Sequence, residues 1–481
     1  MSSTDVQAAA PTAASPGMFA RLTGSAPAAA KDVKVSAFDA IMPEAARGKE
    51  RFIPVTRFAL LDRLTSPTAW PGGQAREARR FFRYLDHWRR QQYNAQLSEL
   101  EETYEPFSPD SDLLMTRTFT PDERAVMQAR VTEGMARILT QANYVRIDHN
   151  DVEQILTRES AYGLDLQVDL EVFDEVLLYY RGASTRRDQR RRWNRFYLRE
   201  QFDVPTFQRL FLLFKVKPLD NHVRQVMQAQ KLSRREAEKI VKRARDSMPP
   251  AVKDTCIYMK LFKNIPRSDL EMVFPNTRVR FRFFDKIRLG ATASGGLGLG
   301  AFGAAGKIAL LATNPIATAG ALVGLGGIAF RQAVNFMNQK QRYMVVMAQN
   351  LYFHAMADNR GVMLKLGARA AEEDIKEEML LYSVLTKERA RRQDLPDIDA
   401  AIEQYLAASF GVSVDFDISD ALERLIADGI VVEHPDGRLE AMQPKEGASH
   451  IDKKWDAFLD ELPEPISAEG MEFEGDAAIP A

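Results

Sequence analysis

The chain contains a long stretch that carries almost no charge. Between Arg288 and Arg331 lie 42 residues whose only charged side chain is Lys307. A Thr-Asn-Pro turn at residues 313–315 separates a segment of 24 residues (289–312) from one of 23 residues (315–337). Each segment is long enough to span a membrane, because a helix needs about 20 residues to cross the hydrocarbon core of a bilayer. Lys and Arg are enriched on both flanks, as on the cytoplasmic side of membrane proteins. The sequence therefore predicts a transmembrane helical hairpin over residues 289–337.

Other interpretations of this stretch stay open. A single transmembrane span would place one of the two basic flanks, and the large soluble part attached to it, on the side of the membrane where Lys and Arg are not enriched. A buried hairpin in a soluble core, or a re-entrant loop, is favoured by the eleven glycines between residues 289 and 330. The GxGxxG pattern at residues 298–303 lacks the acid about 20 residues downstream that a dinucleotide site requires. Glycines four apart, such as Gly296 and Gly300, instead let membrane helices pack closely and would allow an oligomer.

Composition narrows the class of protein. The 65 Lys and Arg residues balance 66 Asp and Glu residues, and a net charge of -1 argues against a surface devoted to nucleic acid. The single cysteine, Cys256, excludes an internal disulfide framework and is expected in the core. A mean hydropathy of -0.30 excludes a polytopic membrane protein.

Hydrophobic periodicity predicts an α+β fold in several parts. Helical spacing of Phe81, Leu85 and Trp88 indicates an amphipathic helix with arginines, Arg89 among them, on its other faces. Runs rich in β-formers predict antiparallel strands after residue 165. The predicted parts are a disordered tail (1–46), a helical unit (47–150), an antiparallel β-rich α+β domain (151–288), the membrane hairpin (289–337), a helical segment (338–395), a winged-helix-like module (396–445) and an acidic tail (446–481).

Local signals place several elements. Ser233 and Glu236 form a capping-box pattern for a helix over residues 233–245, and Asp122 is the expected cap of an earlier helix. Residues 343–357 are expected to be helical. Near the C-terminus, two helices followed by two short strands around a Pro-Asp-Gly turn resemble a winged helix. Its second helix is acidic, which repels phosphate, so the module is interpreted as a site for protein partners.

No catalytic, cofactor or metal site is predicted. The six histidines are scattered without metal-ligand spacing. A dense acidic run on a predicted helix lacks histidine partners and is interpreted as a solvated or partner-facing surface, with Glu372 and Lys376 as an i, i+4 pair. The acids of this run are Glu372, Glu373, Asp374, Glu377 and Glu378.

An arginine-rich run lies between residues 181 and 199, with Trp and Tyr interleaved. Arginine pairs with phosphate, and the neighbouring membrane segment favours anionic lipid headgroups over nucleic acid. A solvated β-hairpin loop explains the run equally well. The candidate lipid-contact residues are Arg186, Arg187, Arg190, Arg191 and Arg192.

A motif before the uncharged stretch resembles an uncharacterised membrane family. Residues 261–271 read LFKNIPRSDLE and are followed by Pro275, with matching blocks at residues 351–362 and 370–382. The chain thereby resembles the transmembrane-protein-143-like family, which carries domain of unknown function 3754. The resemblance implies a membrane hairpin between two motif blocks. It assigns no catalytic residue to this chain. The charged and turn residues of the motif are Lys263, Pro266, Arg267, Asp269 and Glu271.

These observations favour a membrane-anchored scaffold or adaptor without enzymatic activity. The expected location is a bacterial or mitochondrial inner membrane, with the soluble parts on the cytoplasmic or matrix side. The alternative is an enzyme or lipid-handling protein at the membrane surface, with its site near the motif. A weaker alternative is a membrane-tethered nucleic-acid binder. Lipid and protein are the expected partners.

Overall fold

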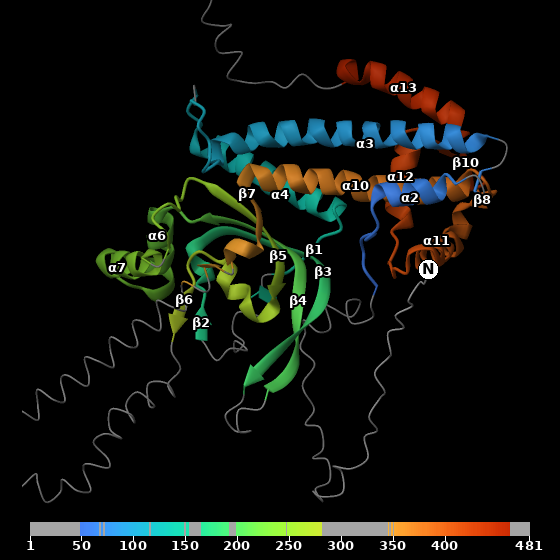
Figure 1. The fold of residues 1–481 in the computed structure, drawn as a ribbon. Helices are drawn as coiled ribbons and strands as arrows, with labels where there is room; N and C mark the ends of the chain where they lie inside the picture. The colour runs from blue at the N-terminus through green and yellow to red at the C-terminus, as the bar shows by residue number, and fades with distance from the viewer. Residues whose placement is uncertain are drawn as a thin grey trace, which may run out of the picture. The chain divides into compact units, whose positions relative to one another are not determined.

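The computed structural model describes residues 49–66, 69–70, 73–114, 117–148, 151–152, 165–191, 199–246, 248–280, 345, 348–349 and 351–461. All of these belong to one compact unit, Glu44–Ala481. It is a mixed α+β fold whose sheets are antiparallel, as the sequence predicts (Figure 1).

A five-stranded sheet has the strand order β1-β3-β4-β5-β7. Its longest strands, β3 and β4, form a hairpin whose register runs from Phe173 opposite Val216 to Arg191 opposite Arg199. The strands are β1 (Val145–Arg146), β3 (Phe173–Arg191), β4 (Arg199–Val216), β5 (Ile257–Pro266) and β7 (Ala355–Asp358).

Both faces of this sheet are buried along the base of the hairpin. Leu177 and Phe211 belong to a core shared with three helices, whereas Leu178 and Leu210 alternate with them and are also buried. A strand buried on both faces reads as a continuous apolar run. This explains why residues 210–214 are all apolar instead of apolar at every second position.

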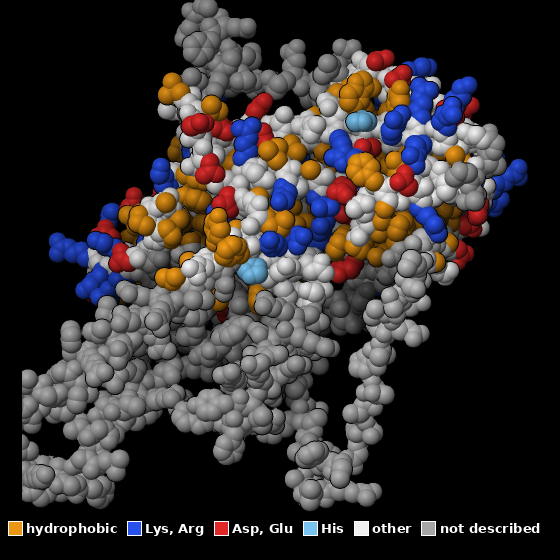
Figure 2. Space-filling model, in the orientation of Figure 1, with side chains coloured by type: hydrophobic (Ala, Val, Ile, Leu, Met, Phe, Trp, Pro, Cys, Tyr) orange, Lys and Arg blue, Asp and Glu red, His pale blue; other side chains and the backbone are white. Residues whose placement is uncertain are grey.

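Three helices cover one face of the sheet: α3 (Gln74–Tyr104), α4 (Pro121–Gln141) and α10 (Asn359–Leu385). The Tyr104 hydroxyl at the end of α3 donates to the carbonyl of Ile257 at 2.9 Å and ties the helix to β5. On the face seen in Figure 2, Lys and Arg side chains mix with Asp and Glu over the helical layer.

The start of α4 differs from the prediction. Thr120, not Asp122, is the N-cap, and it forms a capping box with Glu123. Pro121 occupies the first turn, where a residue without an N–H is tolerated. The helix therefore begins two residues earlier than the sequence suggests.

A helical hairpin connects β4 to β5. It consists of α6 (Leu219–Gln230) and α7 (Arg234–Arg245), and the predicted capping box of Ser233 with Glu236 is confirmed. Two short 3-10 helices lie nearby, η2 (Leu170–Val172) and η4 (Arg267–Val273), and a small second sheet pairs β2 (Asp165–Gln167) with β6 (Arg278–Arg280).

The predicted order of two helices and two strands is observed near the C-terminus. It comprises α11 (Leu395–Phe410), α12 (Ile418–Ala427), β9 (Val431–Glu433) and β10 (Arg438–Ala441). A third strand, β8 (Ala390–Arg391), pairs with β10 and widens the wing. A further helix, α13 (Pro444–Glu461), packs along α3 and was not predicted as a helix.

The N-terminal segment runs between these parts. Glu50 forms a parallel bridge with Val414, and Lys49 pairs with Glu403 of α11 at 2.8 Å. The short helix α2 (Arg57–Leu64) follows and joins the core of α3, α10 and the winged-helix-like module. Sequence positions 350 residues apart thus share one core.

The helix predicted over residues 343–357 ends earlier than expected. Residues 351–354 are helical, but Ala355 begins β7, which pairs with β5. Within the described residues, no helix combines the length and the apolarity needed to cross a membrane. The predicted hairpin at residues 289–337 lies outside the described residues.

Candidate functional site: a buried ionic network

The acidic run on α10 is buried, so its interpretation as a solvated surface is wrong. Glu373, Asp374, Glu377 and Glu378 are all less than 5% exposed. Lys376 pairs with Glu373 one turn away, not with Glu372. The cause is the position of α10 between α3, α4, α12 and the sheet, which leaves almost no face of the helix exposed to solvent over residues 370–385.

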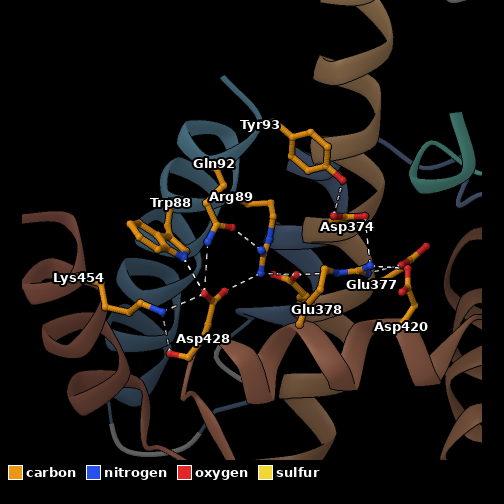
Figure 3. A network of polar contacts seen from close by, with 11 residues as sticks. Trp88, Arg89, Gln92, Tyr93, Asp374, Glu377, Glu378, Asp420, Asp428 and Lys454 are labelled. Atoms are coloured by element: carbon orange, nitrogen blue, oxygen red, sulfur yellow. Dashed lines mark hydrogen bonds and ion pairs between the residues drawn. The ribbon is translucent and has the colours of Figure 1, made fainter. Parts of the chain in front are cut away.

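Figure 3 shows Asp374, Glu377, Glu378 and Asp420 close together, and the cation among them is Arg424 of α12. Its Nη2 donates to Glu377 at 2.6 Å and its Nε to Glu378 at 2.9 Å. Its Nη1 pairs with Asp420 at 2.5 Å and lies 3.4 Å from Asp374. One guanidinium thus contacts four carboxylates from two helices.

Arg89 of α3 extends the network toward the C-terminal end of α12. Its Nη2 lies 2.7 Å from both Glu378 and Asp428. The prediction placed Arg89 on the polar face of its helix, but the residue is only 7% exposed. Asp428 also accepts hydrogen bonds from the Trp88 indole at 3.0 Å and from Lys454 of α13 at 3.2 Å. The network therefore links α3, α10, α12 and α13.

The carboxylates of the network outnumber its cations. Arg89, Arg424 and Lys454 face five acids, namely Asp374, Glu377, Glu378, Asp420 and Asp428.

Burial favours the protonated form of two of these acids, Asp374 and Glu377. Desolvation raises the pKa of Asp374 to about 7 and that of Glu377 to about 8, although Arg424 opposes both shifts. Asp428 behaves differently: burial would raise its pKa, but Arg89 and the Trp88 hydrogen bond outweigh burial and lower it. Near neutral pH the network can therefore hold protons on Asp374 and Glu377.

The acids around Arg424 have the spacing of a metal site but already hold a cation. Carboxylate oxygens of Asp374, Glu377 and Asp420 lie within 4.8 Å of one another. Such an all-oxygen set suits Mg²⁺ or Ca²⁺. However, Arg424 lies within ion-pair distance of all three acids and supplies the positive charge there. The geometry is that of an internal salt-bridge hub.

The arginine run lies on the outer part of the β3–β4 hairpin. The register places Arg187 opposite Asp203 and Arg190 opposite Glu200, while Arg186 lies opposite Val204 and Arg191 opposite Arg199. Directly opposed positions of opposite charge stabilise a hairpin. Two of the candidate lipid contacts therefore have acids across the hairpin, and Arg192 lies outside the described residues.

The motif residues are spread over β5 and η4. Lys263 is exposed on β5, Pro266 ends that strand, and Arg267 begins η4. Glu271 is buried at 3% exposure. Asp269 also lies on η4. Lys263 and Glu271 therefore face different environments, and the structure does not bring them together.

Sequence reasoning missed the ionic network although a signal was present. On α10 the acids are interleaved with Ala370, Ala371, Ile375, Met379 and Leu380, so apolar residues occur on every side of the helix. A helix that is apolar all round is buried. Charges within such a helix are expected to be paired in the interior.

The fold and the network define a mixed α+β protein with an attached winged-helix-like module. Residues 173–361 match the model of a family described as a protein of unknown function (DUF3754). The match runs from β3 to the start of α10, so it includes the sheet hairpin and the uncharged stretch but not the ionic network. No solved structure matches the chain.

Proposed function

We propose that this protein is a membrane-anchored scaffold whose folded parts all lie on one side of the bilayer. The observation that carries the proposal is that the described segments before and after the uncharged stretch pair within one compact unit. Before the stretch, β5 lies inside the sheet, and after it, β7 pairs with β5 from Lys260 opposite Asp358 to Phe262 opposite Ala355.

Strand pairing across the stretch restricts how it can enter a membrane. A segment that crosses the bilayer once would carry β7 and α10 to the side opposite β5 and α3. Those elements share one core, as Leu97 of α3 and Leu366 of α10 illustrate. An even number of crossings, or a re-entrant loop, is compatible with that core. This supports the hairpin over residues 289–337 and disfavours the single span.

The charged groups support a structural role over catalysis. The buried acids of the network pair with Arg89, Arg424 and Lys454 and thereby join four helices. A surface groove of about 300 Å³ between α3 and α4 is lined by charges of mixed sign, including Glu99, Glu133, Arg130 and Arg137. Neither feature presents a nucleophile beside a general base.

The winged-helix-like module is the expected contact for protein partners. Its second helix, α12, turns Arg424 inward onto α10, so the one arginine of that helix is committed to the network. On β9, the edge strand of the wing, Val432 is half-exposed. An exposed apolar residue on an edge strand favours protein contact over nucleic-acid contact.

Accessibility of single cysteines tests the topology. In a Cys256→Ser background, Leu114→Cys precedes the stretch and Lys453→Cys follows it, and both positions are exposed. A membrane-impermeant maleimide should label both positions from the same side of sealed vesicles. Cys256→Ser alone is the control for background labelling. Labelling from opposite sides would contradict the proposal, and so would release of the full-length chain by carbonate.

A further inference from the structure

The α6–α7 hairpin forms a small core of its own. Val223 and Val226 of α6 pack against Ala237 and Val241 of α7. Lys231 ends α6 in the left-handed conformation, at φ 52°. The tight connection and the capping box hold α7 in a fixed orientation. One face of α7 is buried against α6, and the opposite face is open.

A stripe of cations occupies that open face. Arg235, Lys239 and Lys242 follow one another at i, i+4 and i+7 and are exposed. At 100° per residue they project from the side of the helix opposite Ala237 and Val241. Figure 2 shows Lys and Arg side chains gathered at the end of the molecule where Figure 1 places α7.

Three of the four acids of this region are engaged with groups outside the stripe, and the fourth, Asp246, is exposed directly after α7. Glu236 accepts hydrogen bonds from the backbone and hydroxyl of Ser233, and Glu238 pairs with Arg234 at 2.8 Å. Residues 217–246 contain nine Lys and Arg residues but four Asp and Glu residues. Among the ion pairs of the described chain, none includes a member of the stripe. The stripe therefore presents net positive charge outward.

The stripe lies near the point where the chain leaves for the uncharged stretch. The helix α7 packs against η2, which directly follows β2. Strand β2 pairs with β6 from Asp165 opposite Arg280 to Gln167 opposite Arg278. Arg280 ends β6 only nine positions before Leu289, where the uncharged stretch begins.

We infer that the α7 stripe, Arg235, Lys239 and Lys242, binds the anionic headgroups of the bilayer beside the anchor. The inference rests on the proposed membrane anchoring, because the anchor places α7 close to a lipid surface. Lys and Arg side chains near an anionic leaflet are attracted to it within a Debye length. A lipid surface is favoured over nucleic acid because the stripe adjoins the entry of the stretch, whereas the whole chain has a net charge of -1.

Fluorescence quenching on the full-length chain tests this contact. The Cys256→Ser, Ile240→Cys protein carries a fluorophore at position 240, which is exposed beside the stripe and leaves its three cations in place. It is reconstituted into vesicles of phosphatidylcholine with or without phosphatidylglycerol. Neutral acrylamide should quench the label less in the vesicles with phosphatidylglycerol. The difference should vanish in about 1 M salt, where the Debye length falls to about 3 Å.

Two charge variants make the test specific. Arg235→Gln with Lys242→Gln should abolish the protection from quenching. Lys445→Gln with Lys453→Gln removes the same charge from exposed positions of α13 and should leave the protection intact.

Each other outcome has a distinct meaning. Equal quenching in both kinds of vesicle overturns the headgroup contact while leaving the anchor intact. Protection by added RNA but not by phosphatidylglycerol overturns it in favour of a nucleic-acid surface. A chain that carbonate strips from both kinds of vesicle overturns the anchoring and this contact together.

Discussion

Glu373 and Lys376 lie one turn apart on α10, with 3.0 Å between the lysine nitrogen and the carboxylate, and each side chain is 1% exposed. Together they hold the backbone of Ile53: its N–H donates to Glu373 at 3.1 Å, and Lys376 donates to its carbonyl at 2.6 Å. Arg181 of β3 approaches the same carboxylate at 3.5 Å and stacks on the Phe52 ring. The pair therefore fastens the N-terminal segment to α10.

Removing the lysine should cost much stability. Lys376→Met leaves Glu373 charged and buried, and breaking a buried pair in this way typically costs about 3–5 kcal/mol. Chemical unfolding of the purified protein in detergent measures the loss. Arg369→Met is the matched control, because Arg369 and Glu372 form an i, i+3 pair on the same helix at 43% and 25% exposure. Its loss should stay below about 1 kcal/mol. Equal losses of stability in the two variants would contradict the role of Lys376 in holding the backbone of Ile53.

Arg424 should be replaceable by a divalent cation. Arg424→Ala removes the guanidinium from Asp374, Glu377 and Asp420, so the variant should unfold at a lower temperature. Mg²⁺ or Ca²⁺ should then raise that temperature in the variant and not in the unaltered protein, because the three carboxylates retain metal-ligand spacing. Asp420→Asn, at a half-exposed position, is the control and should cost about 1 kcal/mol or less. If Arg424→Ala unfolds at a much lower temperature and neither Mg²⁺ nor Ca²⁺ raises that temperature, Arg424 does not occupy the place of a metal ion.

The free energy of unfolding should fall as pH rises from about 5, just above the ordinary pKa values of the two carboxyls, to about 8. The folded-state pKa values of Asp374 and Glu377, about 7 and about 8, are raised above their ordinary values by burial. Between the unfolded and folded pKa values the native state binds more protons, so the free energy of unfolding decreases with pH. Denaturant unfolding at a series of pH values measures the slope. Glu377→Gln should flatten it, and an unchanged slope in that variant would contradict the assignment.

Close approach of α13 to α3 should make Gly447 intolerant of a side chain. A Cβ there would lie 2.7 Å from Cε2 of Phe81, whose ring is fully buried and lies 4.3 Å from the Tyr382 ring. Gly447→Ala should therefore cost about 1–3 kcal/mol. Gly361→Ala on α10, where the nearest atom is 3.9 Å away, should instead stabilise by about 0.5–1 kcal/mol. Thermal unfolding shows whether each variant is less or more stable than the unaltered protein. A Gly447→Ala variant of unchanged stability would argue against the tight packing.

Elements with local signals were predictable from the sequence. The helix α7 was found from Ser233 and Glu236, and the order of two helices and two strands around the Pro-Asp-Gly turn was expected near the C-terminus. Tertiary neighbours were not predictable in this way. The environment of Arg89 depends on Glu378 and Asp428, which lie more than 280 residues away in sequence. From amphipathic spacing alone, a charged side chain is predicted to face solvent unless its ion-pair partner is known. For this reason the ionic network was missed.

The pairing of β5 with β7 also dictates an order of events during synthesis. Residues 267–354 must all be made before β7 can reach β5, and α10 and α13 follow later still. Until then α3 lacks the helices that bury Phe81 and Leu97. Long-range contacts of this kind form slowly, and apolar surface exposed meanwhile favours aggregation. On the ribosome, the uncharged stretch therefore emerges while the folded parts that precede and follow it in the sequence are still incomplete.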